Sequence, residues 1–466
     1  MKKAFSTFMF AAIVVSFLLL PQQQTVNAQA QIPAYESSFQ IQNLDNVDPA
    51  IIRIYYYNPN GSLAILPEPY VNPVVDTVLP GSSNTYIPIH PDAGFKGSAV
   101  VSSDKEIAIM SNLTIAATNR ALGTYTGISN GGTELYFPLI DKRNNVSVFS
   151  VQNAESEVAN YTVDFIPLPG GGFADIPEIT NSLEIGAAAI YNMEDYNGSD
   201  PWLGSIKVTT TTGKVTGVVS NVNKNLPDSP RNAVYNGFTD GNPTAILPLI
   251  MEANNYNRTG TSCQNIGPGP TTITMSYSPS EGFPPREPDV FPDVPENGIA
   301  VKLMYDVGTR WIGSSTVTAS DGANIVCVVN QSRPIKGNSN IYEGFKPSAA
   351  TDTVVLPLIM SKNGSSTKTF TAFSIASADG SDISVTCDWK PSAGFADIAD
   401  TTKDSAPVLL FNQQTGFSPS DTRWIGSAVC TENSGKGIFA VVNQSREGLP
   451  SNYFRDVTSA YDGFNY

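Results

Sequence analysis

The sequence contains a single histidine, His90, among 466 residues. Catalytic sites of the Ser-His-Asp type need a histidine as their general base. Residues 127–131 read G-x-S-x-G, but the nucleophile elbow that this pattern can mark needs a histidine later in the chain, and none follows. The shortage of histidine therefore predicts a protein that is not an enzyme and has no catalytic residue.

Charged residues are scarce as well, at 15% of the chain, and 42 acidic side chains stand against 27 basic ones. Binding to nucleic acid needs a basic surface, so this balance excludes nucleic acid as a partner. No D-x-D-x-D loop occurs, so calcium is compatible with the acidic surface but a calcium site cannot be derived from the sequence. We expect no other cofactor.

Long apolar runs are also rare, and the one that occurs covers residues 8–20. It is too short to span a membrane comfortably, which takes about 20 apolar residues. Lys2 and Lys3 precede the run and Ala28-Gln29-Ala30 follows it as a cleavage site, with a second site two residues earlier. Residues 1–30 are therefore predicted to be a secretory signal peptide. We expect the mature chain to be secreted or held at the extracellular cell surface, with no membrane insertion after cleavage.

Glycine, proline and aromatic residues are abundant, with 37 Gly, 34 Pro, 22 Phe and 19 Tyr. Such a composition is typical of many short strands joined by turns, and helical periodicity is not sustained anywhere in the chain. The composition predicts an all-β protein.

A fourfold internal repeat is the strongest signal in the sequence. An aromatic-x-Gly-Ser step recurs about every 110 residues, and each step leads into a strand, a turn and an apolar strand that ends in asparagine. The four steps are Phe95-Lys96-Gly97-Ser98, Trp202-Leu203-Gly204-Ser205, Trp311-Ile312-Gly313-Ser314 and Trp424-Ile425-Gly426-Ser427. The asparagines are Asn112, Asn221, Asn330 and Asn443.

Three further landmarks keep the same order in the copies. The aromatic-x-Pro steps are Tyr57-Asn58-Pro59, Phe165-Ile166-Pro167, Tyr277-Ser278-Pro279 and Trp389-Lys390-Pro391. The Tyr-x-Gly steps are Tyr125-Thr126-Gly127, Tyr235-Asn236-Gly237, Tyr342-Glu343-Gly344 and Tyr461-Asp462-Gly463. A short apolar strand follows three of them, at Phe137-Pro138-Leu139-Ile140, Leu247-Pro248-Leu249-Ile250 and Leu356-Pro357-Leu358-Ile359.

These landmarks predict four tandem immunoglobulin-like β-sandwich modules of about 110 residues, each with about seven strands. Barrels stay compatible with the strand count. A module of this size can bury its own core, so we expect beads on a string. The predicted modules span residues 31–134, 135–244, 245–353 and 354–466.

Three tryptophans, Trp202, Trp311 and Trp424, occupy equivalent positions in the last three modules. A repeated aromatic residue in a repeated strand ordinarily fills a core, so we expect these side chains to be buried. A role in stacking against sugar rings is the alternative.

The four cysteines fall two in the third module and two in the fourth. Cysteines of an exported chain usually pair, and separate module cores favour the disulfides Cys263–Cys327 and Cys387–Cys430 over the two other connectivities. No C-x-x-C spacing occurs, so a metal or redox site is the weaker interpretation.

The segment Ile32-Pro33-Ala34-Tyr35 precedes the first module much as the Leu-Pro-Leu-Ile strand precedes the others. If such a strand opens each module, every module is complete and the chain is a monomeric stalk. If the strand instead closes the preceding module, the fourth module has an open edge, and this segment of another subunit fills it as an assembly strand. Copies would then join head to tail into a filament.

The repeated phrases Trp-Ile-Gly-Ser and Val-Val-Asn-Gln-Ser resemble repeat modules of uncharacterised secreted proteins of filamentous bacteria. More loosely, the chain resembles the sandwich arrays of S-layer proteins and surface adhesins. The resemblance implies a self-associating structural subunit of an extracellular filament, sheath or S-layer-like assembly. The alternative is a carbohydrate-binding or adhesive stalk whose partner is a surface glycan. A glycosidase with two carboxylates stays compatible with the composition, although the acidic residues do not recur at equivalent repeat positions.

Overall fold

The protein is all-β, with 64% of its residues in strands and 2% in helix. A computed structural model describes residues 9–13, 35–45, 47–86, 95–115, 122–143, 145–223, 232–254, 256–304, 308–333, 338–363, 368–391, 394–412, 423–447 and 458–465. Within these residues the helical segments are three short 3-10 turns, η1 (Met193–Asp195), η2 (Ser320–Gly322) and η3 (Pro347–Ala349).

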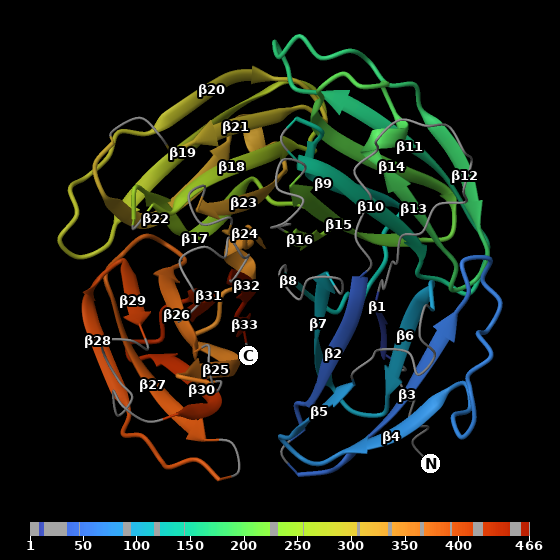
Figure 1. Ribbon diagram of the computed structural model, residues 1–466. Helices are drawn as coiled ribbons and strands as arrows, with labels where there is room; N and C mark the ends of the chain where they lie inside the picture. Colours follow the sequence, from blue (N-terminus) through green and yellow to red (C-terminus); the bar gives the residue numbers. More distant parts are fainter. Residues whose placement is uncertain are drawn as a thin grey trace, which may run out of the picture. The chain divides into compact units, whose positions relative to one another are not determined.

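Each of the four repeats folds into two antiparallel sheets, so the predicted β-sandwich modules are confirmed (Figure 1). We call the sheet that contains the aromatic-x-Gly-Ser strand the W sheet, and the sheet that ends in the Tyr-x-Gly strand the Y sheet. Counting strands along a module, the W sheet has the order 1-6-3-4 and the Y sheet the order 5-2-7-8.

The strands of modules 1 and 2 follow this scheme. Module 1 has the W sheet β1 (Met9–Ile13), β6 (Ser98–Ser103), β3 (Ala50–Tyr57), β4 (Val74–Val78) and the Y sheet β5 (Ser83–Tyr86), β2 (Tyr35–Asn43), β7 (Ile107–Ile115), β8 (Leu122–Thr126). Module 2 has the W sheet β9 (Glu134–Asp141), β14 (Leu203–Thr212), β11 (Ala159–Pro167), β12 (Ile179–Leu183) and the Y sheet β13 (Ala188–Asn192), β10 (Asn145–Asn153), β15 (Val215–Asn223), β16 (Asn232–Asn236).

Modules 3 and 4 repeat the scheme, and module 4 adds one short strand. Module 3 has the W sheet β17 (Thr244–Glu252), β22 (Trp311–Ala319), β19 (Thr271–Pro279), β20 (Asp289–Val294) and the Y sheet β21 (Ile299–Leu303), β18 (Arg258–Asn265), β23 (Ile325–Arg333), β24 (Asn338–Glu343). Module 4 has the W sheet β33 (Phe464–Asn465), β25 (Thr353–Ser361), β30 (Trp424–Glu432), β27 (Ile383–Pro391), β28 (Thr401–Ala406) and the Y sheet β29 (Val408–Asn412), β26 (Lys368–Ser377), β31 (Ile438–Glu447), β32 (Thr458–Asp462).

Side-chain periodicity explains how these strands pack. Strand β3 alternates between buried and more exposed residues, so one of its faces lies on the core. Strand β15, in contrast, buries seven consecutive residues from Val215 to Asn221, which means that both of its faces are covered. The asparagines expected to end the apolar strands lie inside them instead, because β7, β15, β23 and β31 continue past Asn112, Asn221, Asn330 and Asn443.

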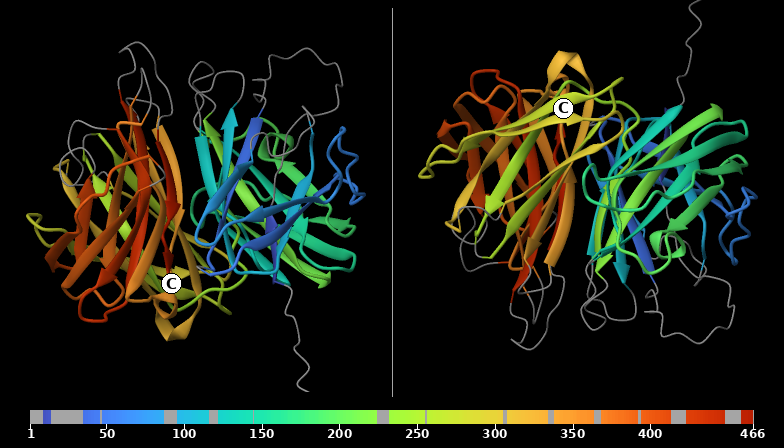
Figure 2. Two further views of the ribbon diagram at one scale, coloured as in Figure 1. Left: turned by 90° about the horizontal axis from the view of Figure 1, so that it is seen from below. Right: turned by 90° about the horizontal axis from the view of Figure 1, so that it is seen from above.

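The chain divides into two compact units, made mainly of modules 1 and 2 and of modules 3 and 4. The first comprises Met1–Ile166, Ala174–Pro227 and Val234–Asp240, and the second Pro167–Phe173, Asp228–Ala233 and Gly241–Tyr466. In the second unit, the strands of module 4, drawn in orange and red, run alongside one another in both views of Figure 2. Val218 and Val234 of module 2 join the core cluster of module 1, and Val441 of module 4 joins that of module 3. The modules within a unit are therefore packed together rather than being independent beads.

Candidate functional site

The first strand of modules 2, 3 and 4 pairs with the aromatic-x-Gly-Ser strand of the same module, as β17 does with β22. In modules 2, 3 and 4 the strand therefore opens the module that follows it. At its other side the first strand meets the residues just after the Tyr-x-Gly step, through Tyr136 with Phe238, Ile246 with Phe345 and Val355 with Phe464.

A proline interrupts each of these first strands and produces a β-bulge. In β17, Leu247 lies opposite Ser315 and Ile250 opposite Gly313, so Pro248 and Leu249 together face a single residue. Proline has no N–H to donate, and the extra residue leaves the ladder locally unpaired. The same register shift occurs in β9 and β25.

The tyrosine of the Tyr-x-Gly step bonds the backbone at this bulge. The buried Tyr342 hydroxyl donates to the Leu249 carbonyl oxygen at 2.7 Å and accepts from the Leu249 N–H at 3.2 Å. The same two bonds join Tyr235 to Leu139 and Tyr461 to Leu358. We call this arrangement the tyrosine clamp, because it fastens the last strand of a module to its first.

The three repeated tryptophans are buried, with 0%, 4% and 2% of their surfaces exposed for Trp202, Trp311 and Trp424. Each indole N–H donates to a backbone carbonyl oxygen at 2.9–3.0 Å, on Ala174, Pro284 and Ala396 respectively. Because their faces lie inside the modules, these side chains cannot stack against a sugar ring.

The glycine of the aromatic-x-Gly-Ser step is required by a close approach of the neighbouring strand. A Cβ at Gly204, Gly313 or Gly426 would lie 2.1–2.2 Å from the carbonyl oxygen of the middle residue of the aromatic-x-Pro step. In module 1 a Cβ at Gly97 would meet the Tyr57 carbonyl oxygen at 1.9 Å. Tyr57 thus takes the middle position of the aromatic-x-Pro step in module 1, one residue earlier than the repeat in the sequence predicted.

Both disulfides join directly opposed residues of neighbouring strands. Cys263 in β18 is bonded to Cys327 in β23, within the Y sheet of module 3. Cys387 in β27 is bonded to Cys430 in β30, within the W sheet of module 4. The pairing is the one expected from separate cores, and all four sulfurs are buried.

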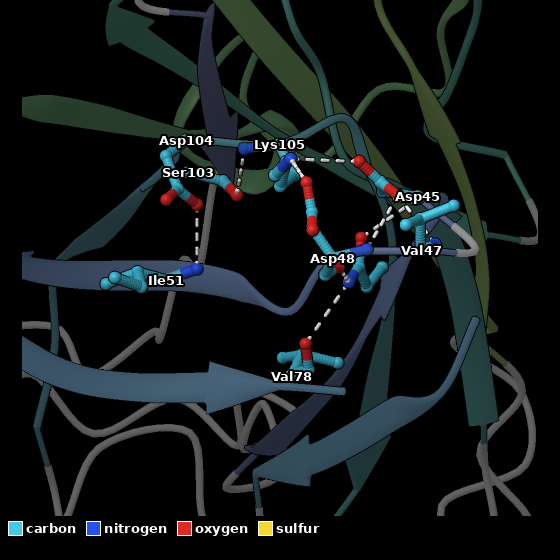
Figure 3. Close-up of polar contacts among 9 residues, drawn as sticks. Asp45, Val47, Asp48, Ile51, Val78, Ser103, Asp104 and Lys105 are labelled. Atoms are coloured by element: carbon cyan, nitrogen blue, oxygen red, sulfur yellow. Dashed lines mark hydrogen bonds and ion pairs between the residues drawn. The ribbon is translucent and has the colours of Figure 1, made fainter. Parts of the chain in front are cut away.

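A cluster of charged side chains lies at one end of module 1 (Figure 3). The Lys105 ammonium group bonds the carboxylates of Asp45 at 3.0 Å and Asp48 at 2.6 Å. The backbone N–H groups of Asp48 and Val47 also donate to the Asp45 carboxylate, and with Lys105 they lower its pKa to about 2. These contacts hold the turn between β2 and β3. In the part of the chain that the structure describes, no group of three or more His, Cys, Asp or Glu side chains is placed to hold a metal ion.

The two modules of the first unit meet at the x residues of their Tyr-x-Gly steps. The Asn236 side-chain amide donates to the Thr126 hydroxyl at 2.9 Å and to the Thr126 carbonyl oxygen at 3.2 Å. A second contact joins the Ser98 hydroxyl to the Gly186 carbonyl oxygen. Both pairs are neutral.

The second unit places two acidic residues at the same x positions. Burial, followed by repulsion from the Glu343 carboxylate, raises the pKa of Asp462 well above its usual range, although a backbone hydrogen bond from Glu343 opposes this effect. Nearby, Phe345 stacks on Phe439 with ring centroids 4.6 Å apart, and the Ser374 hydroxyl donates to the Pro248 carbonyl oxygen at 2.8 Å. The x residue of the Tyr-x-Gly step therefore lies at the contact between two modules. The sequence repeat located this residue but did not reveal the contact.

The segment expected to act as an assembly strand lies mostly outside the described residues, which include neither Ile32, Pro33 nor Ala34. Tyr35 is the first residue of β2, the second strand of its module. The first-strand place of module 1 is held by β1, residues 9–13, which pairs with β6 (Figure 1). His90 also lies outside the described residues.

The fold and these contacts define an all-β tandem-repeat protein. No family model matches the chain. No curated protein matches it either. A crystal structure of the tetra-tandem repeat in the extending region of a large adhesion protein is similar over 95% of this chain and 97% of that chain, with 14% sequence identity and a TM-score of 0.10. A TM-score this low does not indicate a shared fold or a shared function.

Among the described residues, no helix has the length and apolar character needed to cross a membrane.

Proposed function

We propose that the protein is a self-associating structural subunit of an extracellular surface assembly, in which tandem sandwiches supply length and lateral surface. The observation that carries this proposal is that the repeated side chains make their contacts inside the modules rather than at the surface. The tryptophans and the clamp tyrosines are buried and hydrogen-bonded within their own modules, and the glycines two residues after the tryptophans lie against a neighbouring strand of the same module. The repeated residues therefore maintain the fold of each module, as expected for modules that serve to lengthen a structural protein.

An extracellular location is supported by the disulfides Cys263–Cys327 and Cys387–Cys430. Disulfides persist in oxidising compartments and are rare where thiols are kept reduced. The apolar N-terminal run and the cleavage sites behind it supply the means of export.

Electron microscopy of the protein purified from the culture medium tests the proposal, together with size-exclusion chromatography coupled to light scattering. We expect filaments or sheets and a mass of several chains. A protein that stays monomeric at all concentrations and shows no ordered assembly would contradict a structural role.

An adhesive stalk is the second candidate, and one observation favours it. Large apolar side chains are exposed between β3 and β5 of module 1 and include Leu63, Ile65, Tyr70, Val71, Val75 and Leu79. Exposed apolar patches commonly mark interaction sites. Binding to a glycan array or to whole cells that is lost in Tyr70→Ala and kept in Tyr256→Ala, which removes an exposed tyrosine of module 3, would favour the stalk.

A further inference from the structure

The place of the first strand is filled differently in module 1 than in the other modules. In modules 2 to 4 it is filled by the residues that come shortly before the second strand, since β9 ends at Asp141 and β10 begins at Asn145. In module 1 the second strand begins at Tyr35, whereas the strand in the first place is β1, residues 9–13. Module 1 thus takes its first strand from the apolar N-terminal run.

The register of β1 is that of a first strand. Ile13 lies opposite Ala99, two residues after Gly97 of the aromatic-x-Gly-Ser step. Leu247 lies opposite Ser315, which also follows its glycine by two residues, and Leu356 lies opposite Ala428 in the same way. Strand β1 therefore occupies the place that the Leu-Pro-Leu-Ile strands occupy elsewhere.

Cleavage of the signal peptide would empty this place. A cut after Ala28 or Ala30 removes β1 and leaves at most six residues before Tyr35. A first strand such as β17 takes nine residues and is followed by a turn, so the remaining residues are too few to replace it. Strand β6, which carries the core residue Val101, would then be a sheet edge with unpaired backbone groups.

We propose that module 1 of the exported protein is a strand acceptor, which binds an extended Leu-Pro-Leu-Ile-type segment donated by another polypeptide built from the same kind of module. This inference rests on the export proposed above. The sequence of the donor segment is inferred from β9, β17 and β25, which occupy the first-strand place in modules 2, 3 and 4. The donor carries an apolar residue opposite Ala99, a proline after it, and a leucine whose backbone reaches Tyr125.

Tyr125 is the acceptor's counterpart of the clamp tyrosines. It is buried, as Tyr235, Tyr342 and Tyr461 are. Burial raises its pKa although a hydrogen bond with the Ser111 side chain opposes this effect, so the hydroxyl is neutral and, like those of the other clamp tyrosines, has one proton to donate and lone pairs to accept. Ile128 follows it by three residues, as Phe345 follows Tyr342, and packs against the module 1 core. A donated strand would therefore lie between β6 and this segment and gain main-chain bonds, as in other cases of strand addition.

The test uses residues 31–466 and a fluorescently labelled synthetic peptide with the sequence of residues 244–252, Thr-Ala-Ile-Leu-Pro-Leu-Ile-Met-Glu. We expect saturable binding in fluorescence anisotropy, new hydrogen-exchange protection of the β6 amides, and no binding of a scrambled peptide. Equal binding of both peptides, or β6 amides already protected without peptide, would overturn the proposal.

Tyr125→Phe supplies the specific control. Loss of the two clamp bonds should weaken peptide binding roughly tenfold. Tyr235→Phe removes the same hydroxyl from module 2, whose first strand is covalently attached, and should leave the affinity unchanged. Equal effects of the two substitutions would overturn the role of Tyr125 as the acceptor group.

A chain with residues 244–252 joined by a flexible linker in front of residue 31 keeps the proposal testable if residues 31–466 fold poorly. It should melt at a higher temperature than residues 31–466 and should no longer bind the peptide. An unchanged melting temperature with retained binding would contradict the proposal.

Mass spectrometry of the exported protein separates the possible failures. An N-terminus upstream of Met9 would show that β1 is retained, which overturns the acceptor. Specific peptide binding by a protein that never assembles would support the acceptor and remove only the structural role proposed above.

Discussion

Individual residues of the repeat are fixed by contacts that lie far away in sequence. Gly313 must be glycine because the Ser278 carbonyl oxygen, 35 positions earlier in the chain, occupies the space of a side chain. Trp311 packs edge-on against Tyr277 at 5.9 Å and donates its indole N–H to Pro284. The aromatic residue and the glycine after it thus form one packing unit with the neighbouring strand.

Gly313→Ala should lower the free energy of unfolding of the module pair by about 2–3 kcal/mol, because the added methyl group forces the strands apart. Urea denaturation measures the change. Gly260→Ala is the matched control, since the closest contact of its Cβ would be the end of the partly exposed Leu303 side chain, and the nearest backbone oxygen, that of Lys302, would lie 3.9 Å away. Similar losses for both variants would show that the carbonyl contact is not the cause.

A buried ion pair in module 3 gives a second prediction at this scale. The Glu252 carboxylate is 1% exposed and accepts hydrogen bonds from the Arg286 guanidinium group at 2.7 Å and from the Gly308 N–H at 3.0 Å. Arg286→Met leaves a buried carboxylate without its cation and should cost about 3–5 kcal/mol of stability.

Thermal unfolding of the Arg286 variant checks this value against Lys214→Met, which removes the cation of the exposed Lys214–Glu155 pair. That control should change stability by less than about 1 kcal/mol. A loss for Arg286→Met as small as that of the control would refute the prediction.

At the scale of strands, the tyrosine clamp decides how a module closes. Tyr342→Phe keeps the ring but leaves the Leu249 N–H and C=O without their shared partner inside the module. We expect a loss of about 1–3 kcal/mol and faster hydrogen exchange in β17 than in β19. Tyr256→Phe, at an exposed position, should leave both quantities unchanged.

Much of this layout could be predicted from the sequence. The composition predicted the all-β class, and the repeat predicted the number of modules and the cysteine pairs. The ownership of the Leu-Pro-Leu-Ile strand could not be predicted, because a strand between two modules can pair with either one and only the register of Leu247 with Ser315 decides. The role of β1 was missed for another reason: an apolar run near a cleavage site is typical of a signal peptide, and its ability to pair as a strand leaves no separate mark.

At the scale of the whole molecule, the repeat is organised in pairs of modules. The x residues of the Tyr-x-Gly steps meet within each unit, as Thr126 with Asn236 and as Glu343 with Asp462. The sequence showed four similar modules, but the pairing depends on side chains that vary between copies, so the repeat pattern did not reveal it.

The acidic pair makes the second unit sensitive to pH. Unfolded Asp462 releases its proton near pH 3.8, whereas folded Asp462 retains it to higher pH. Unfolding is therefore increasingly favoured as the pH rises above about 4, until the pH passes the raised pKa of the folded state. Asp462→Asn, which copies Asn236 of the first unit, should remove this slope and stabilise the unit at neutral pH by about 1 kcal/mol or more.

Urea titrations between pH 2 and pH 8 test this prediction. Glu432 serves as the opposite control, because its hydrogen bonds outweigh its burial and lower its pKa to about 2, so its contribution is lost as the pH falls below 4.5. Glu432→Gln should therefore lower the stability by a constant amount above about pH 4.5 and change the slope of the profile only below that pH. An unchanged slope in Asp462→Asn would contradict the assignment.

The bridge between Ile246 and Phe345 has a mechanical consequence. Ile246 lies near the start of module 3 and Phe345 near its end, and the two residues form an antiparallel bridge. The segments by which the chain enters and leaves the module therefore lie next to each other. A force that pulls the two ends apart would load these bonds one after another, as in opening a zip, instead of shearing a whole strand at once. The Cys263–Cys327 disulfide joins β18 to β23. The chain between these two cysteines, which are 64 residues apart in sequence, could therefore not be extended by the force. A stretched module 3 would thus yield at its ends and hold at its centre.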